Sequence, residues 1–167
     1  MVRLVAWRAL ALSLCAALAA CQVQLAPAYD EALAEGLSQA SADSMTLLAS
    51  AAGGTSAGTY ASRRDEYSQL IGRLEALALA AGARPMPKNK VGDAINRLLE
   101  KRGSPALEDD DATPPSAHAI RKVAETFAKM RDTDRKQGVT AFEVEAFKGQ
   151  VRIYLDQAIT YENFLER

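Results

Sequence analysis

The stretch that indicates the fold most clearly runs from Val139 to Leu165 and reads VTAFEVEAFKGQVRIYLDQAITYENFL. Thr140 and Glu143 have the spacing of a capping box, in which two side chains satisfy free backbone N–H groups at the start of a helix. Apolar residues then recur every three or four positions: Phe147, Val151, Tyr154, Leu155, Ala158, Tyr161 and Leu165. This spacing predicts an amphipathic helix over 141–165.

Two further helices are predicted in the first half of the chain. The first covers about 31–51 and follows Asp30, whose side chain suits a helix N-cap. The second covers about 60–81, with Thr59 as its cap and Gly82 as its stop. Its inward residues are Tyr60, Tyr67, Leu70, Ile71, Leu74, Leu77 and Ala78. Its charged residues are expected mostly to face solvent: Arg63, Arg64, Asp65, Glu66 and Arg73.

A third long helix is predicted over about 116–137, with Ser116 as its cap and Gly138 as its stop. Its inward residues are Ile120, Val123, Ala124, Phe127 and Met130. No alternating run is long enough to indicate a sheet. The four long helices predict an all-α protein, specifically an antiparallel four-helix bundle covering 30–167.

The connection over 83–115, between the second and third long helices, is irregular. Apolar spacing predicts a short extra helix that ends before Gly103, with Val91, Ile95, Leu98 and Leu99 on its apolar side. The acidic run over 108–111 and the pair Pro114-Pro115 predict an exposed segment. This connection is either a crossover or a recognition loop, and the sequence does not choose between them.

The first 20 residues have the organisation of a targeting peptide. Arg3 and Arg8 give a basic start, and residues 10–18 give an apolar run. The run is shorter than the ~20 apolar residues that cross a bilayer. It ends in the small-residue sequence Leu18-Ala19-Ala20-Cys21. We therefore set residues 1–20 apart as a signal peptide, with an uncleaved anchor as the last of the alternatives.

The sequence Leu18-Ala19-Ala20-Cys21 resembles the cleavage site of bacterial lipoprotein precursors. That resemblance implies diacylglyceryl transfer to the Cys21 sulfur, cleavage after Ala20 and acylation of the new N-terminus. Two or three acyl chains hold a protein stably on a bilayer. Gln22 follows the cysteine, which implies sorting to the periplasmic face of the outer membrane. An ordinary signal peptide with a free Cys21 remains the alternative.

The short segment 21–29 contains a proline and predicts an extended tether of at most ~30 Å between lipid and domain. Dispersed positions of the mature chain resemble a family of uncharacterised bacterial lipoproteins: Tyr29-Asp30, the Tyr60 and Tyr67 pair, and Tyr161-Glu162 near the end of the last helix. The resemblance implies a helical envelope lipoprotein and brings no established catalytic residues.

Composition excludes several classes of function. Without residues 1–20, 147 of the 167 residues remain, with 18 Lys and Arg against 21 Asp and Glu. A weakly acidic chain without clustered basic residues argues against nucleic-acid binding. Cys15 leaves with the signal peptide and Cys21 carries lipid, so no thiol remains for a disulfide, a metal or a nucleophile.

Catalytic, metal and cofactor sites find no support in the residue pattern. His118 is the only histidine, which excludes di-iron Glu-x-x-His pairs and multi-histidine zinc sites. We expect it to be an ordinary first-turn or surface histidine. The acidic run 108–111 lacks the spacing of a calcium loop and is expected to be solvated. The segment 53–58 lacks a phosphate-binding lysine and is expected to be a flexible turn.

The leading hypothesis is a non-enzymatic envelope lipoprotein that binds another protein or contributes to an envelope assembly. The alternative is a carrier or sensor of a small apolar ligand held between the helices, which would need an enclosed pocket. A cell-wall enzyme ranks last, because it would need converging carboxylates that no motif marks.

Overall fold

The computed structural model describes residues 26–85, 91–107 and 113–166. Within these ranges the chain forms helices and no strand, so the predicted all-α fold class is confirmed. The elements in chain order are α2 (Glu31–Ser50), the 3₁₀ helix η1 (Ala57–Ser62), α3 (Arg64–Gly82), α4 (Val91–Lys101), α5 (Pro115–Gln137) and α6 (Ala141–Leu165).

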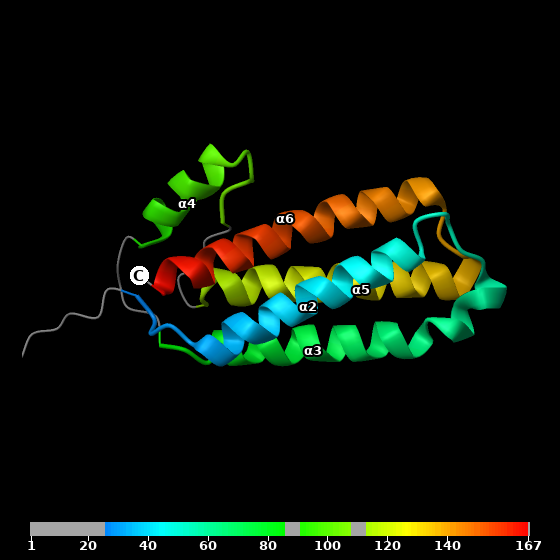
Figure 1. The fold of residues 1–167 in the computed structure, drawn as a ribbon, viewed down its shortest axis with the longest axis horizontal. Helices are drawn as coiled ribbons and strands as arrows, with labels where there is room; N and C mark the ends of the chain where they lie inside the picture. Colours follow the sequence, from blue (N-terminus) through cyan, green and yellow to red (C-terminus); the bar gives the residue numbers. More distant parts are fainter. Residues whose placement is uncertain (1–25, 86–90, 108–112, 167) are drawn as a thin grey trace, which may run out of the picture.

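The four long helices lie side by side, and α4 lies outside them against α6 (Figure 1). α3 packs against α2 and α5, and α6 packs against α5 and α2. Contacts therefore run around the four helices as a ring. The start of α2 and the end of α6 lie at one end of the molecule, and the turn between α5 and α6 lies at the other (Figure 1).

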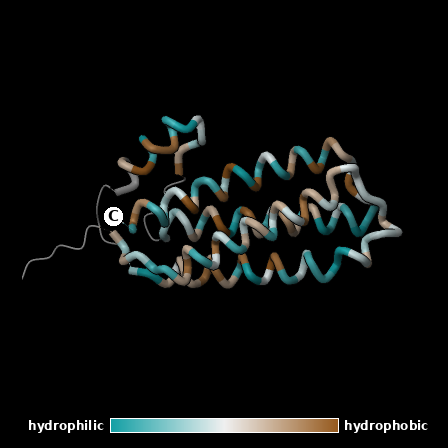
Figure 2. The backbone as a smooth tube through the Cα atoms, viewed as in Figure 1, coloured by the Kyte–Doolittle hydropathy of each residue, from teal (hydrophilic) through white to brown (hydrophobic). Residues whose placement is uncertain are grey.

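A single hydrophobic core fills the space between the long helices, and hydrophobic residues recur along each of them (Figure 2). The largest fully buried apolar side chains in this core include Tyr67, Phe127, Leu37, Leu48, Leu74, Ile120 and Met130. All five residues predicted to face inward from the third helix are buried. Burial of such side chains is the main favourable contribution to folding.

Two predicted helix starts are confirmed in detail. The Thr140 hydroxyl accepts a bond from the Glu143 amide at 3.2 Å, and the Glu143 carboxylate accepts one from the Thr140 amide at 2.8 Å. The Asp30 carboxylate accepts a bond from the Leu33 amide at 3.0 Å. α5 ends at Gln137 and is followed by Gly138, which confirms the predicted stop; Gly138 has a positive φ of 84°.

Ser116 does not cap the third helix. α5 begins one residue earlier, at Pro115, and Pro114 occupies the N-cap position. Proline suits the first helical position because it lacks the N–H that would have no partner there. Ser116 lies inside the first turn and is fully buried. Both prolines are also buried, which corrects the prediction that they belong to an exposed segment.

The second long helix starts later than predicted. Tyr60 belongs to the 3₁₀ helix η1, and α3 begins at Arg64. Thr59 is not the cap of α3: its hydroxyl donates to the Ser56 carbonyl at 2.9 Å within η1. α3 ends at Gly82, which confirms the predicted stop, although Gly82 has no positive φ.

The short extra helix is confirmed as α4, with Ile95 and Leu99 fully buried. It ends in a Schellman motif: the Ser104 amide bonds the Leu99 carbonyl, and the Gly103 amide bonds the Glu100 carbonyl, each at 3.0 Å. Gly103 has the positive φ, 70°, that this ending requires.

Candidate functional site

The outer face of α6 is covered by α4 over its C-terminal part only. Four buried residues form the contact, namely Ile95, Leu99, Leu107 and Tyr161. Burial raises the pKa of Tyr161 to about 12. This cluster is separate from the main core. The outer face of α6 thus packs against another helix, α4, over its C-terminal part.

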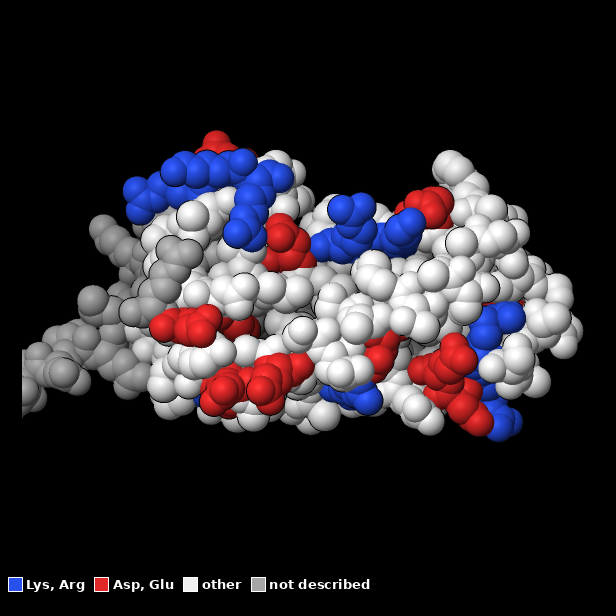
Figure 3. Space-filling model, in the orientation of Figure 1, with Lys and Arg blue, Asp and Glu red and all other residues white. Residues whose placement is uncertain are grey.

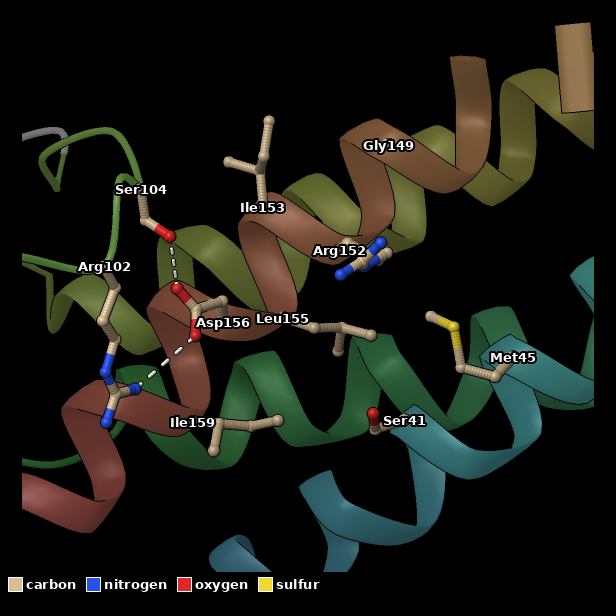
Figure 4. Close-up of a pocket in the computed structure, with 10 residues that line it drawn as sticks. All are labelled: Ser41, Met45, Arg102, Ser104, Gly149, Arg152, Ile153, Leu155, Asp156 and Ile159. Carbon is tan, nitrogen blue, oxygen red and sulfur yellow. Dashed lines mark hydrogen bonds and ion pairs between the residues drawn. The ribbon is translucent and has the colours of Figure 1, made fainter. Parts of the chain in front are cut away.

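Polar side chains fasten the chain after α4 to the same face. Ser104 Oγ donates to Asp156 Oδ2 at 2.5 Å. Arg102 Nη1 donates to Thr160 Oγ1 at 2.9 Å and lies 3.6 Å from Asp156 Oδ1. Figure 4 shows Arg102 and Ser104 converging on Asp156. Asp156 therefore anchors the exit of α4 on α6.

Residues 105–107 are held by two amide side chains. Gln157 Nε2 donates to the carbonyls of Pro105 and Ala106, at 3.1 and 3.2 Å. Asn96 Oδ1 accepts from the Leu107 amide at 2.8 Å. Because these bonds satisfy backbone groups of an irregular segment, the chain after α4 forms a defined rim beside α6.

An open groove of ≈ 540 Å³ lies between α2 and α6, next to this rim (Figure 4). Its apolar lining includes Met45, Leu155 and Ile159, and its basic lining is Arg102 and Arg152. A volume in this range suits a small ligand. The groove nevertheless opens to the surface between two helices.

A second open groove, of ≈ 480 Å³, shares Gly149 and Ile153 with the first. It is also lined by Ala146, Tyr154 and the rim residue Pro105. A Cβ added at Gly149 would meet no atom within 4 Å, so the helix surface is open there. The two grooves therefore border one strip of the α6 surface.

That strip, which we call the α6 outer strip, consists of Phe142, Ala146, Gly149 and Ile153. All four are exposed. Phe142 is 84% exposed and Ile153 is 39% exposed, and their spacing of eleven residues places them on the same side of α6. The strip lies on the N-terminal side of the part of α6 that α4 covers.

The flanks of the α6 outer strip are charged. Lys and Arg gather over α4 and the middle of α6, whereas Asp and Glu lie mainly along α2 and α3 on the face in view (Figure 3). Glu145 pairs with Lys148 one turn later at 3.1 Å. Arg152 makes no ion pair or hydrogen bond among the described residues.

A buried carboxylate lies at the end of the molecule away from α4. Asp134, on α5, is fully buried and accepts bonds from Arg63 Nε and Nη2, both at 2.9 Å. Thr55 Oγ1 donates to it at 2.6 Å, and the Tyr67 hydroxyl donates at 3.3 Å. Burial raises the pKa of Asp134, but the bonds from Arg63 and Thr55 outweigh burial and hold its pKa below the ordinary value.

This network corrects two expectations. Arg63 was expected to face solvent, but its side chain is only 12% exposed because it pairs with Asp134. The segment 53–58 was expected to be a flexible turn, but the Thr55 amide donates to the Val139 carbonyl at 2.7 Å and the Val139 amide donates to Thr55 Oγ1 at 2.8 Å. The turn is thus bonded to the start of α6.

A second buried carboxylate lies at the other end of the molecule, near the C-terminal end of α6. Glu162 is 1% exposed and accepts from Arg84 Nη1 at 2.8 Å and from Arg84 Nη2 at 2.5 Å. Arg84 Nη2 also donates to Ser116 Oγ at 3.2 Å. These bonds connect the end of α3 with α5 and α6, which explains why Ser116 is buried rather than capping a helix.

The predicted lipidation site, Cys21, lies outside the described residues. So do its flanking residues Leu18, Ala19 and Ala20, and the acidic run 108–111. His118 lies in the first turn of α5 and is half-buried. Within 26–85, 91–107 and 113–166, no three His, Cys, Asp or Glu residues are placed to hold a metal ion. None of the helices in those ranges combines the length and the apolar character needed to cross a membrane.

Sequence reasoning missed the α6 outer strip and both buried ion pairs. Phe142 and Ile153 could have been found, because they fall off the predicted apolar side of the helix over 141–165. The partners of Asp134 and Glu162 leave no such signal, since they come from distant parts of the chain. Comparison of the chain with family models, with curated proteins and with solved structures finds no match to any of them.

Proposed function

We propose that this chain is a lipid-anchored, non-enzymatic protein of the bacterial cell envelope that binds a protein partner through the α6 outer strip. Cys21 would carry the lipid, and the domain would sit on the periplasmic face of the outer membrane. The observation that carries the binding role is the exposure of Phe142 and Ile153 on a helix face that already receives α4. Apolar residues exposed together mark interaction sites more often than isolated ones do.

We also propose that α2, α3, α5 and α6 form an antiparallel four-helix bundle. The ring of contacts among them supports this arrangement. The three residues 138–140 that join α5 to α6 are a connection of the length found between antiparallel neighbours. Such a bundle presents straight, rigid helix faces, which suits the display of a binding strip.

A non-enzymatic role is supported by the state of the buried carboxylates. Asp134 and Glu162 each bind an arginine through both oxygens. Acid–base catalysis needs a carboxyl group that can exchange protons with a substrate. These two groups instead hold helices together.

The second candidate is a carrier of a small amphipathic ligand in the groove between α2 and α6. Its apolar lining of Met45, Leu155 and Ile159 favours such a ligand, and Arg152 would meet an acidic group. The groove is open rather than enclosed, so it would bury little of a ligand. We therefore rank protein binding first.

Photo-crosslinking in living cells tests the binding role. A photoreactive amino acid in place of Phe142 should give a reproducible crosslinked species, to be identified by mass spectrometry. The matched control is the same amino acid in place of Leu79, which is 73% exposed on α3. Equal labelling from both positions, or none from position 142, would contradict the proposal.

The anchor has a separate test. Cys21→Ala should give protein that no longer partitions into detergent and no longer incorporates labelled fatty acid, whereas Cys15→Ala should partition normally. Normal partitioning of Cys21→Ala would refute lipidation at this cysteine.

A further inference from the structure

The α6 outer strip has the spacing of a helix-pairing surface. Phe142, Ala146, Gly149 and Ile153 follow one another at intervals of four, three and four residues. These are the intervals of the a and d positions that face a second helix in a coiled coil. All four are exposed, whereas Val144, between them in sequence, is buried on the inner side of α6. The strip is therefore a second apolar side of α6, distinct from its core side.

Two charged residues on one flank of the strip match each other. Glu145 and Arg152 are seven residues apart and occupy the same flanking position of the repeat, where interhelical ion pairs form. Glu145 is 62% exposed, and Arg152 has no ion-pair partner among the described residues. One flank of the strip thus carries an acid near its start and a base near its end.

Antiparallel pairing of two α6 helices joins these features. If Phe142 faces Ile153 of a second copy, Ala146 faces Gly149 of that copy, and the helices approach most closely at these small residues. In such a two-fold pair, residues at the same flanking position of the two helices lie beside each other. Glu145 of each copy therefore lies beside Arg152 of the other copy. Both ion pairs are complementary.

We propose that the α6 outer strip pairs with the same strip of a second copy of this chain around a two-fold axis. The inference rests on the proposed function for its use of the strip, and deepens it by naming the partner. A self-matching surface is what a two-fold interface requires, because one patch must complement itself. Repeated charge complementarity of Glu145 with Arg152 favours a second copy over an unrelated helix.

The arrangement agrees with two lipid anchors on one bilayer. The two-fold axis is perpendicular to both α6 helices. It places Ala26 of one copy and Ala26 of the other at opposite ends of the dimer. Both lie at the same distance from a membrane that is perpendicular to the axis. Each predicted tether over 21–29 spans at most ~30 Å. The two domains would therefore lie with their long axes along the membrane surface.

Charge reversal tests the pairing on the full chain purified in detergent, with the oligomeric state measured by sedimentation velocity. Glu145→Arg and Arg152→Glu each place like charges at both contacts, so each should raise the dimer dissociation constant about tenfold or more. An equal mixture of the two variants should regain the wild-type dimer, because each mixed pair has both contacts complementary. The control Glu75→Arg, an exposed position on α3, should dimerise as wild type does.

Rescue in the mixture also shows that neither variant has lost its fold. A wild-type chain that stays monomeric at about 100 μM would overturn the inference, and so would a dimer that both reversals leave unchanged. A crosslink from position 142 to a different protein, with a monomeric wild-type chain, would overturn the inference while supporting the proposed function.

Discussion

Arg63 and Asp134 form a two-point ion pair, in which Nε meets Oδ2 and Nη2 meets Oδ1, both at 2.9 Å. The side chains are 12% and 0% exposed. The pair joins the start of α3 to the end of α5, and Thr55 binds the same carboxylate. Three separate parts of the chain therefore meet at one buried charge.

Replacing that charge should destabilise the protein strongly. In Asp134→Asn the Arg63 guanidinium stays largely buried without its counter-charge, which costs about 3 kcal/mol in the free energy of unfolding. Urea denaturation followed by circular dichroism measures this loss. The control is Asp132→Asn, because Asp132 is 52% exposed two residues earlier on the same helix and should change stability little. Similar losses in both variants would argue against a special role for Asp134.

The same carboxylate predicts a pH dependence. Burial raises the pKa of Asp134, but the bonds from Arg63 and Thr55 lower it more, so the folded pKa lies below the unfolded value of about 3.9. The unfolded chain then binds the proton more readily, so the stabilisation is fully present at pH 5 and above, well above the unfolded pKa, and is lost as the pH falls through the folded pKa.

Urea denaturation at pH 7, 5, 4 and 3 tests this sign. The difference in unfolding free energy between wild type and Asp134→Asn should be constant from pH 7 to 5 and shrink toward pH 3. The difference for Asp132→Asn should stay small at every pH. A difference for Asp134→Asn that grows on acidification would contradict the assignment.

Local signals in the sequence predicted most of the fold. Asp30 and the Thr140–Glu143 box satisfy backbone groups within three residues of themselves, so their effect can be inferred from spacing alone. The positive φ of Gly138 is equally local, although the close approach of the Thr55 and Ser56 backbone to this glycine is a distant contact. The ends of α4 and α6 were predicted from equally local signals, namely Gly103 after α4 and the apolar repeat that runs to Leu165 in α6.

Contacts between distant residues could not be predicted in this way. Arg63 lies 71 residues from Asp134, and no spacing rule connects them. In sequence Arg63 is one charge among several on an amphipathic helix, and Ser116 is a good cap residue. Tertiary partners decide both cases: Asp134 draws Arg63 inward, and Arg84 binds Ser116 inside a helix turn. The α6 outer strip was missed because helical spacing was used to identify only one apolar side of the helix, the side that faces the core.

One chemical change at two glycines should have opposite effects. At Gly138 the φ is 84°, and a Cβ would lie 2.4 Å from the Thr55 carbonyl oxygen and 2.8 Å from the Ser56 Cα. Because both are backbone atoms that cannot rotate away, Gly138→Ala should cost about 3 kcal/mol or more. Gly72 lies inside α3, where a Cβ meets nothing within 4 Å, so Gly72→Ala should stabilise the protein by about 0.5–1 kcal/mol. Thermal unfolding of both variants measures the signs, and a neutral Gly138→Ala would show that the turn can shift.

The buried pair of Arg84 and Glu162 should behave as one unit. Removing either partner leaves the other charge buried, so Arg84→Met and Glu162→Leu should each cost about 3 kcal/mol. The double variant leaves no unpaired charge and should lose well under the sum of the two, with a coupling energy of about 1–3 kcal/mol in a double-mutant cycle. The exposed pair of Arg73 and Asp43, at 43% and 38% exposure, provides the control, and its cycle should give a coupling below about 1 kcal/mol. Additive losses at Arg84 and Glu162 would mean that solvent reaches the pair in solution, because only desolvated charges depend so strongly on each other.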